Sequence, residues 1–188
     1  MDSNSPAGGE MKRASAEILT MLIPVFLILT ACGNDTTGIT PPVLPHDPVN
    51  EGWKAIDNYE YAYNTMDTDL LAVTLDNGFL HHLLEENWDD YNGDGVIDST
   101  WGYNLELTFA EGYFSAYDCC EFTLTGEDQY TWPEDPSGES IAYPRSYLMR
   151  FYKINPSGQT GFTETGEFIL VCKPDSSGNW HLTHLIDL

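Results

Sequence analysis

Apolar residues change their spacing once along this chain, near Tyr117, and this change limits the possible folds more than any other feature. Before Tyr117, apolar residues recur every three or four positions, which is the spacing of amphipathic helices. After it, short runs of β-branched and aromatic residues alternate with turn-forming residues, which is typical of strands. Helices followed by a series of strands predict an α+β fold, in which N-terminal helices pack on a curved antiparallel sheet.

Two helices are expected at the start of the folded region. The first begins at Asp47-Pro48, a capping residue followed by a proline suited to the first turn, and continues to about residue 66. The second is shorter, is capped by Asp67 or Thr68, and ends at Asp76-Asn77-Gly78, whose residues tolerate left-handed dihedrals. Residues 79–84 could continue as helix or form a strand, and we favour the strand.

A third helix and five strands complete the expected elements. Ser99 or Thr100 caps the helix, which carries apolar residues at intervals of four: Trp101, Leu105, Phe109 and Tyr113. The strands are expected at residues 119–125, 129–132, 140–154, 162–173 and 180–187. Pro, Asn, Ser and Gly residues separate the last three strands and predict hairpin connections.

The order of these elements resembles the NTF2-like (nuclear transport factor 2-like) cone fold of exported bacterial proteins. The matching segments are Tyr59-Glu60-Tyr61-Ala62-Tyr63-Asn64, Leu75-Asp76-Asn77-Gly78-Phe79, Gly178-Asn179-Trp180 and Leu185-Ile186-Asp187. The resemblance covers residues 49–188. It implies a sheet curled around a pocket that different members use for isomerisation, dehydration, small-ligand binding or dimerisation, so a homodimer is one expectation.

The first 31 residues have the features of an export signal. Lys12 and Arg13 precede an uncharged apolar run of 12 residues at 18–29, which is shorter than the roughly 17 to 25 residues that a spanning helix needs. The following Leu29-Thr30-Ala31-Cys32 resembles the lipobox of bacterial lipoproteins. This resemblance implies cleavage before Cys32 and lipidation of its thiol, which would anchor the protein to a membrane of the cell envelope. The alternatives are an uncleaved membrane anchor and a cysteine that follows an apolar stretch by chance.

The chain therefore divides into three expected parts. Residues 1–31 are a cleaved signal peptide, residues 32–46 carry the lipidated Cys32 and a tether rich in Pro, Thr and Gly, and residues 47–188 form the folded domain. Gly33 stands where an Asp would signal retention in the inner membrane of many Gram-negative bacteria, so the resemblance favours an outer-membrane or periplasm-facing location.

Acidic residues dominate the composition, with 30 Asp and Glu against 7 Lys and Arg and a net charge of −23. Nucleic-acid binding needs clustered Lys and Arg to replace the counter-ions of the phosphate backbone, so we expect no nucleic-acid partner. A small ligand or a protein of the cell envelope fits this charge better.

Residues 90–98 resemble the first three-quarters of an EF-hand calcium loop. Gly95 stands at the sharp turn of the loop. The expected ligands are Asp90, Asn92, Asp94, Val96 through its carbonyl oxygen, and Asp98. Trp101 occupies the position of the usual bidentate Glu, so we expect weak Ca²⁺ binding unless Glu85, Glu86 or Asp89 substitutes. An acidic surface loop that needs no ion is the alternative.

Three residues are candidates for the pocket. His81 and His184 could act there as an acid or a base, and Arg150, which is flanked by apolar residues, could bind an anion. We match no Asp or Glu to an inward face beside either histidine. The alternatives are hydrogen-bonded histidines at the edge of the core and a surface ion pair for Arg150.

Three cysteines remain beyond Cys32. Adjacent Cα atoms lie too close for Cys119 to pair well with Cys120, and neighbours on a strand face opposite sides. Either one of these two forms a disulfide with Cys172, or all three are buried thiols.

The first functional hypothesis is a lipid-anchored module that binds a small ligand or a protein partner without catalysis, because no complete catalytic motif is present. The first alternative is a pocket enzyme, an isomerase, dehydratase or hydrolase that uses His81 or His184. A cavity with a carboxylate within hydrogen-bond reach of either histidine would favour that alternative. The second alternative is a calcium-dependent adhesion or scaffolding module.

Overall fold

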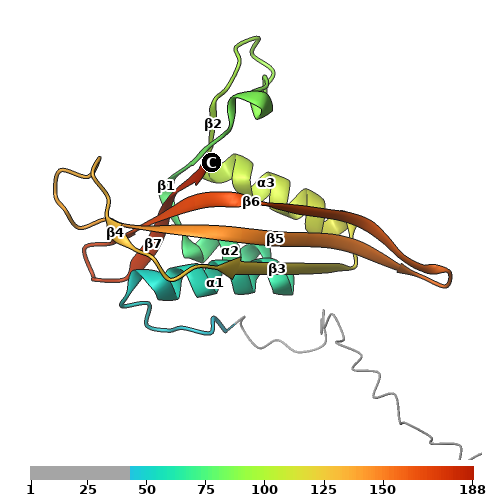
Figure 1. Ribbon diagram of the computed structural model, residues 1–188, viewed down its shortest axis with the longest axis horizontal. Coiled ribbons are helices and arrows are strands. Elements are labelled where there is room, and N and C mark those ends of the chain that lie inside the picture. Colours follow the sequence, from blue (N-terminus) through green and yellow to red (C-terminus); the bar gives the residue numbers. More distant parts are fainter. Residues whose placement is uncertain (1–42) are drawn as a thin grey trace, which may run out of the picture. The chain divides into compact units, whose positions relative to one another are not determined.

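The computed structural model describes residues 43–188. The predicted signal peptide, Cys32 and the tether up to residue 42 lie outside the described residues. In the described part, helices pack against one face of a curved seven-stranded sheet (Figure 1). The elements are α1 (Gly52–Thr65), α2 (Thr68–Thr74), β1 (Leu75–His82), η1 (Glu85–Asn87), β2 (Thr100–Gly102), α3 (Tyr103–Ala116), β3 (Cys119–Thr125), β4 (Tyr130–Thr131), β5 (Ile141–Asn155), β6 (Gly158–Pro174) and β7 (Trp180–Asp187). The predicted α+β class is confirmed.

The strand order is β2-β1-β7-β6-β5-β3, and β4 pairs with β5 outside this path. All pairs are antiparallel except β1 with β7, which is parallel. The predicted curved antiparallel sheet is therefore observed except at this one pair. β1 and β7 are separated by most of the domain, and a long connection allows parallel pairing where a hairpin does not.

The predicted strands agree closely with the observed ones. β3 and β7 have the predicted bounds, and β1 includes most of residues 79–84. β6 begins four residues before the predicted start, because its hairpin with β5 stays paired as far as Asn155 and Gly158. These extra residues are two glycines together with Gln159 and Thr160, so they pair through the backbone without an alternating apolar pattern.

The start of α1 differs from the prediction. The helix begins at Gly52 rather than at Asp47-Pro48, and Glu51 is its N-cap residue. The segment before it is held along the helix, because the backbone N–H of His46 donates to the Asn58 side chain at 3.0 Å. Tyr143 packs closely over Gly52, where a Cβ atom would collide with the Tyr143 hydroxyl group. A residue with a Cβ atom at this position would therefore require the Tyr143 side chain to shift.

The predicted cap of α2 is confirmed, since the Asp67 side chain accepts hydrogen bonds from the backbone of Asp69 and Leu70, both at 3.0 Å. The predicted end of α2 and the predicted start of the third helix are wrong. α2 stops at Thr74, and Asp76-Asn77-Gly78 lies inside β1. Residue Thr100 does not cap a helix, because residues Thr100–Gly102 form β2 and pair with β1.

The core fills the space between the helices and the sheet. Its fully buried large side chains include Phe79, Phe122, Phe151, Leu71, Leu170 and Leu182. Cys120 and Cys172 are free and buried, so the predicted disulfide to Cys172 is wrong. Cys119 is not one of the free thiols, so the alternative prediction of three free thiols is wrong as well.

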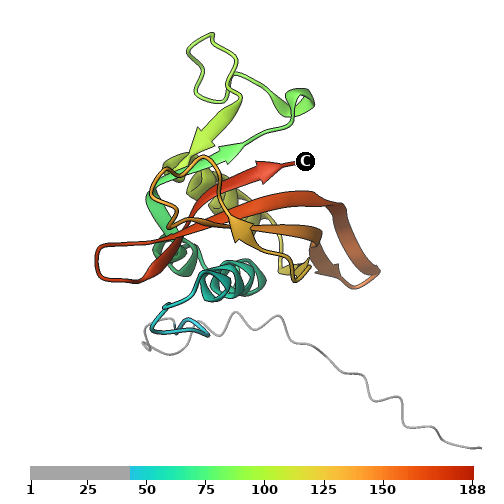
Figure 2. The same cartoon turned by 60° about the vertical axis from the view of Figure 1, so that its left-hand side comes forward.

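The connection between β1 and β2 projects away from the sheet (Figure 2). It contains the predicted calcium loop. Within residues 43–188, no helix has the length and apolar character needed to cross a bilayer.

Candidate functional site

A cavity of about 620 Å³ lies between the inner face of the sheet and helices α1 and α3. Aromatic rings make up much of its wall: Tyr59, Tyr63, Tyr91, Trp101, Phe109, Tyr113, Phe122, Tyr147, Phe151 and Phe168. Five acidic residues also line it: Glu86, Glu106, Glu164, Glu167 and Asp187. A volume of this size is typical of pockets for small organic ligands.

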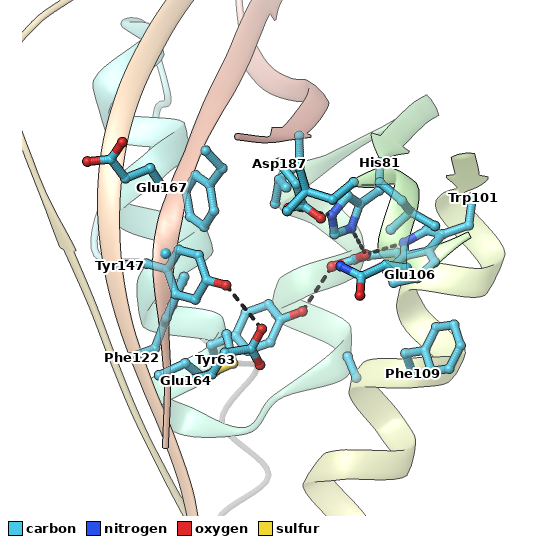
Figure 3. A pocket seen from close by; sticks show the side chains of 18 of the residues that line it. Tyr63, His81, Trp101, Glu106, Phe109, Phe122, Tyr147, Glu164, Glu167 and Asp187 are labelled. Atoms are coloured by element: carbon cyan, nitrogen blue, oxygen red, sulfur yellow. Dashed lines mark hydrogen bonds and ion pairs between the residues drawn. The ribbon is translucent and has the colours of Figure 1, made fainter. Parts of the chain in front are cut away.

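His81 lies between two of these carboxylates (Figure 3). Its Nε2 atom is 3.1 Å from Asp187 Oδ1, and its Nδ1 atom is 3.4 Å from Glu106 Oε2. The ring also packs edge-on against Trp101, with 4.5 Å between ring centroids. Both ring nitrogens therefore have an anionic partner.

The sheet and α3 bring these three residues together. In the parallel pair, His81 of β1 lies opposite Leu185 of β7, so Asp187 stands two residues further along the neighbouring strand. In the antiparallel pair, His81 lies opposite Trp101 of β2. Helix α3 follows β2 directly and carries Glu106 in its first turn, where the helix dipole favours a negative charge.

Glu106 is almost completely buried, and four side chains surround its carboxylate. Trp101 Nε1 donates to Oε2 at 2.7 Å, next to His81. On the other oxygen, the hydroxyl group of Tyr63 donates to Oε1 at 2.9 Å and that of Tyr59 at 3.4 Å. A buried charge is tolerated when it is paired and fully hydrogen-bonded, and Glu106 meets both conditions.

These contacts set the charges of the site. Burial by itself would lower the pKa of His81, but the hydrogen bonds to Asp187 and Glu106 outweigh it and raise the pKa to about 9. Burial would raise the pKa of Glu106, but the contacts with His81, Trp101 and Tyr63 bring it below its ordinary value. At neutral pH the site therefore holds an imidazolium and an ionised Glu106.

Asp187 has fewer hydrogen bonds than Glu106 and is more exposed. It binds His81 through Oδ1, and within residues 43–188 its Oδ2 atom makes no hydrogen bond. Its side chain keeps 19% of its surface exposed, against 4% for Glu106. Since Asp187 lines the cavity, this second oxygen is available to a bound molecule.

Of the predicted pocket residues, only His81 lines the cavity. His184 does not, and its ring stacks on that of His82 at 5.6 Å. The reason is a shift of register between β6 and β7 at Thr183, which places Leu182 and Leu185 on the buried side and turns His184 away. Arg150 is half exposed and pairs with Glu121 at 3.4 Å, so it does not bind an anion in the pocket.

Sequence reasoning missed the two acidic partners of His81. Glu106 precedes Phe109, Ala110 and Tyr113 by three, four and seven residues, which is the spacing of one helix face, and this pattern was available in the sequence. For Asp187 there was no such signal, because strict alternation along β7 predicts the wrong face beyond the irregularity at Thr183.

The predicted calcium ligands lie in the exposed loop between β1 and β2. Asp90 accepts hydrogen bonds from the backbone N–H groups of Asp94 and Gly95 at 3.0 and 2.8 Å. Asn92 accepts one from Asp94, and Asp94 accepts one from Val96. A bridge between Asp89 and Asp98 closes the base of the loop. No group of three or more His, Cys, Asp or Glu side chains in residues 43–188 is arranged to hold a metal ion.

Calcium binding by this loop stays a prediction, with a thermal melt as its test. Ca²⁺ at 100 times its dissociation constant should add about 2.7 kcal/mol to the free energy of unfolding and raise Tm by several degrees. Asp90→Ala should remove the shift, and Mg²⁺ serves as the control ion because it binds such flexible oxygen sites poorly. An unchanged Tm at 10 mM Ca²⁺ would contradict the prediction.

Comparison with protein-family models finds no match, and a search of curated proteins finds none at a significant level. Solved structures do match. A protein from Kribbella flavida gives a TM-score of 0.54 at 10% identity, over 73% of this chain and 86% of that one. An NTF2-like protein with a cystatin-like fold from Novosphingobium aromaticivorans gives 0.50 at 8% identity, over 71% and 76%. Another protein of that organism, whose name proposes a scytalone dehydratase, gives 0.51 at 9% identity, over 71% and 78%. At these identities the likeness shows the fold alone, and that fold is the predicted NTF2-like cone.

Proposed function

We propose that this NTF2-like domain binds a small organic molecule in its cavity and removes a proton from it, with Asp187 as the general base. The observation that carries this proposal is His81, which lies between Asp187 and Glu106 at an aromatic-lined cavity. A carboxylate beside a pocket histidine favours the enzyme over the module that binds without catalysis. The reaction class is an isomerisation or an elimination, in which a C–H bond is broken by a base.

The three residues have different roles in this proposal. Asp187 accepts the proton on Oδ2, because its Oδ1 atom is already bound to His81. His81 is a positioning residue: its hydrogen bond to Oδ1 fixes the direction of the Asp187 carboxylate. Glu106 is a second positioning residue, since its two oxygens are fully used by His81, Trp101 and the two tyrosines.

An elimination probe tests the base directly. In 5-nitrobenzisoxazole, a base removes the C–H proton, the C–H electrons form a nitrile, and the N–O bond breaks to give a coloured phenolate. We expect the purified protein to act on this probe faster than acetate at the same concentration and pH. Asp187→Asn should lower the rate at least 100-fold, which is the lower end of the usual contribution of a general base.

The matched control is Glu111→Gln. Glu111 is exposed on α3, does not line the cavity, and loses the same single charge. This variant should keep the wild-type rate. A wild-type rate no higher than that of acetate, or an unchanged rate in Asp187→Asn, would overturn the catalytic role and leave a pocket that binds without catalysis.

We also propose that the domain is exported and anchored to a membrane of the cell envelope through Cys32. The support is the basic and apolar pattern of residues 1–31 together with Leu29-Thr30-Ala31-Cys32. In cells fed labelled palmitate, Cys32→Ser should abolish labelling and release the protein from the membrane fraction. Cys120→Ser should keep the label, because Cys120 is buried in the domain. Label that persists in Cys32→Ser would refute the anchor.

A further inference from the structure

The cavity has an uneven balance of charge. Its lining includes the five acidic residues named above and one imidazolium, that of His81, but none of the lysines or arginines of residues 43–188. Those five cations lie elsewhere, at Lys54, Arg145, Arg150, Lys153 and Lys173. An anionic ligand would therefore meet repulsion from several carboxylates with a single compensating charge.

His81 compensates only the carboxylates at its own end of the cavity. Across the cavity, Tyr147 and Glu164 point toward each other, while the carboxylate of Glu167 points away from the cavity (Figure 3). The Tyr147 hydroxyl group donates to Glu164 Oε1 at 3.1 Å, while Glu164 Oε2 makes no hydrogen bond within the described domain. Neither Glu164 nor Glu167 forms an ion pair with a cation of residues 43–188. The negative charge of this wall is therefore uncompensated.

The aromatic rings of the cavity wall add an attraction for positive charge. Tyr147 stacks on Phe168 with 4.9 Å between centroids, and Tyr113 stacks on Phe151 at 5.1 Å. The face of an aromatic ring attracts a cation, and the attraction grows where water is excluded. An inorganic cation gains little from such a wall, because it needs several converging oxygen ligands. An organic cation uses both the rings and the carboxylates.

We infer that the cavity selects an organic cation, an amine or quaternary ammonium compound with an apolar body, and that Glu164 is its counter-ion. This inference rests on the proposed function, for which it names the substrate class. The apolar body lies against the aromatic wall, and the ammonium group lies near Glu164. The strongly negative domain also attracts such cations from solution.

Two probes of equal shape test the inference: phenyltrimethylammonium and its uncharged isostere tert-butylbenzene. Trp101 lines the cavity, so tryptophan fluorescence of the purified protein reports their binding. We expect the cation to bind at least tenfold more tightly than the isostere at low salt, and the ratio to fall as salt screens the carboxylates. The cation should also inhibit the elimination reaction of the preceding section.

Glu164→Gln should weaken binding of the cation three- to tenfold and leave binding of the isostere unchanged. Glu164 is exposed to solvent at the cavity, so this isosteric variant is expected to fold. Glu111→Gln, with the same change of net charge outside the cavity, should bind both probes as the wild type does. Equal affinity for the two probes, or an unchanged affinity for the cation in Glu164→Gln, would overturn the inference.

The outcomes separate this inference from the proposed function. If the two probes bind equally while elimination still depends on Asp187, only the selection of cations fails. If the cation is selected but Asp187→Asn keeps its elimination rate, the binding inference stands without catalysis. If neither probe binds at millimolar concentration and no elimination occurs, both fail.

Discussion

Replacement of Glu106 by alanine lowers the free energy of unfolding by about 3 to 5 kcal/mol, the usual cost of removing one partner from a buried ion pair. The variant leaves the protonated ring of His81 without one of its two carboxylates. It also leaves the Trp101 N–H group and the Tyr63 hydroxyl group without their acceptor. Each buried donor without a partner adds a desolvation cost. Urea unfolding of the variant and the wild type at pH 7 measures the difference.

Two further variants show whether the loss of stability comes from the hydrogen-bond network of Glu106 or from a general effect on helix α3. Glu106→Gln keeps the volume and one acceptor oxygen but loses the charge. Its free energy of unfolding should therefore lie between those of Glu106→Ala and the wild type. Glu111→Ala removes an exposed carboxylate from the same helix and should change stability by no more than about 0.5 kcal/mol. A loss below 1 kcal/mol in Glu106→Ala would show that the network contributes little to stability.

Raising the pH from 6.5 to beyond 9 removes about 3 kcal/mol of stability through His81. The pKa of His81 is about 9 in the folded chain, against an ordinary value of 6.5. Because the folded state binds this proton more tightly, the contribution is fully present below pH 6.5 and is lost as the pH rises through 9. Urea unfolding at intervals between pH 6 and 10 measures the slope.

His81→Gln should flatten this slope, and the difference between the two curves isolates the residue. The groups that face the ring are Asp187, Glu106 and Trp101. Burial lowers the pKa values of His82 and His184, so their effect lies below pH 6.5, where stability falls as the pH falls. The lowered pKa of Glu106 likewise acts only at acid pH. A wild-type curve parallel to that of His81→Gln between pH 6.5 and 9 would contradict the prediction.

Local chemistry made much of the fold predictable. The Asp67 cap, the bounds of β3 and β7 and the turn between β5 and β6 all follow from patterns within a few residues. The parallel pairing of β1 with β7 could not be read in this way. It joins residues about 100 positions apart, and neither strand carries a mark of its partner.

The site was harder to predict than the fold. The even spacing of Trp101, Leu105, Phe109 and Tyr113 predicts one helix face, but Trp101 lies on β2 and donates to Glu106 from outside the helix. Because Trp101 is not part of α3, the helix face is defined by Phe109 and Tyr113, and Glu106 lies on the same face. A carboxylate on an apolar face is usually read as an error of the pattern, and here three elements supply the partners that make its burial possible.

The irregularity at Thr183 decides which side chains of β7 face the cavity. On the far side of Thr183, each residue of β7 faces the direction opposite to the one that regular alternation would give it. If β7 kept all its residues but paired with β6 without this irregularity, Ile186 would face His81 and Asp187 would face outward, without any substitution in the site. A one-residue change in the pairing of a strand that contributes no ring to the cavity wall is therefore enough to turn an acid–base site into an inert apolar pocket.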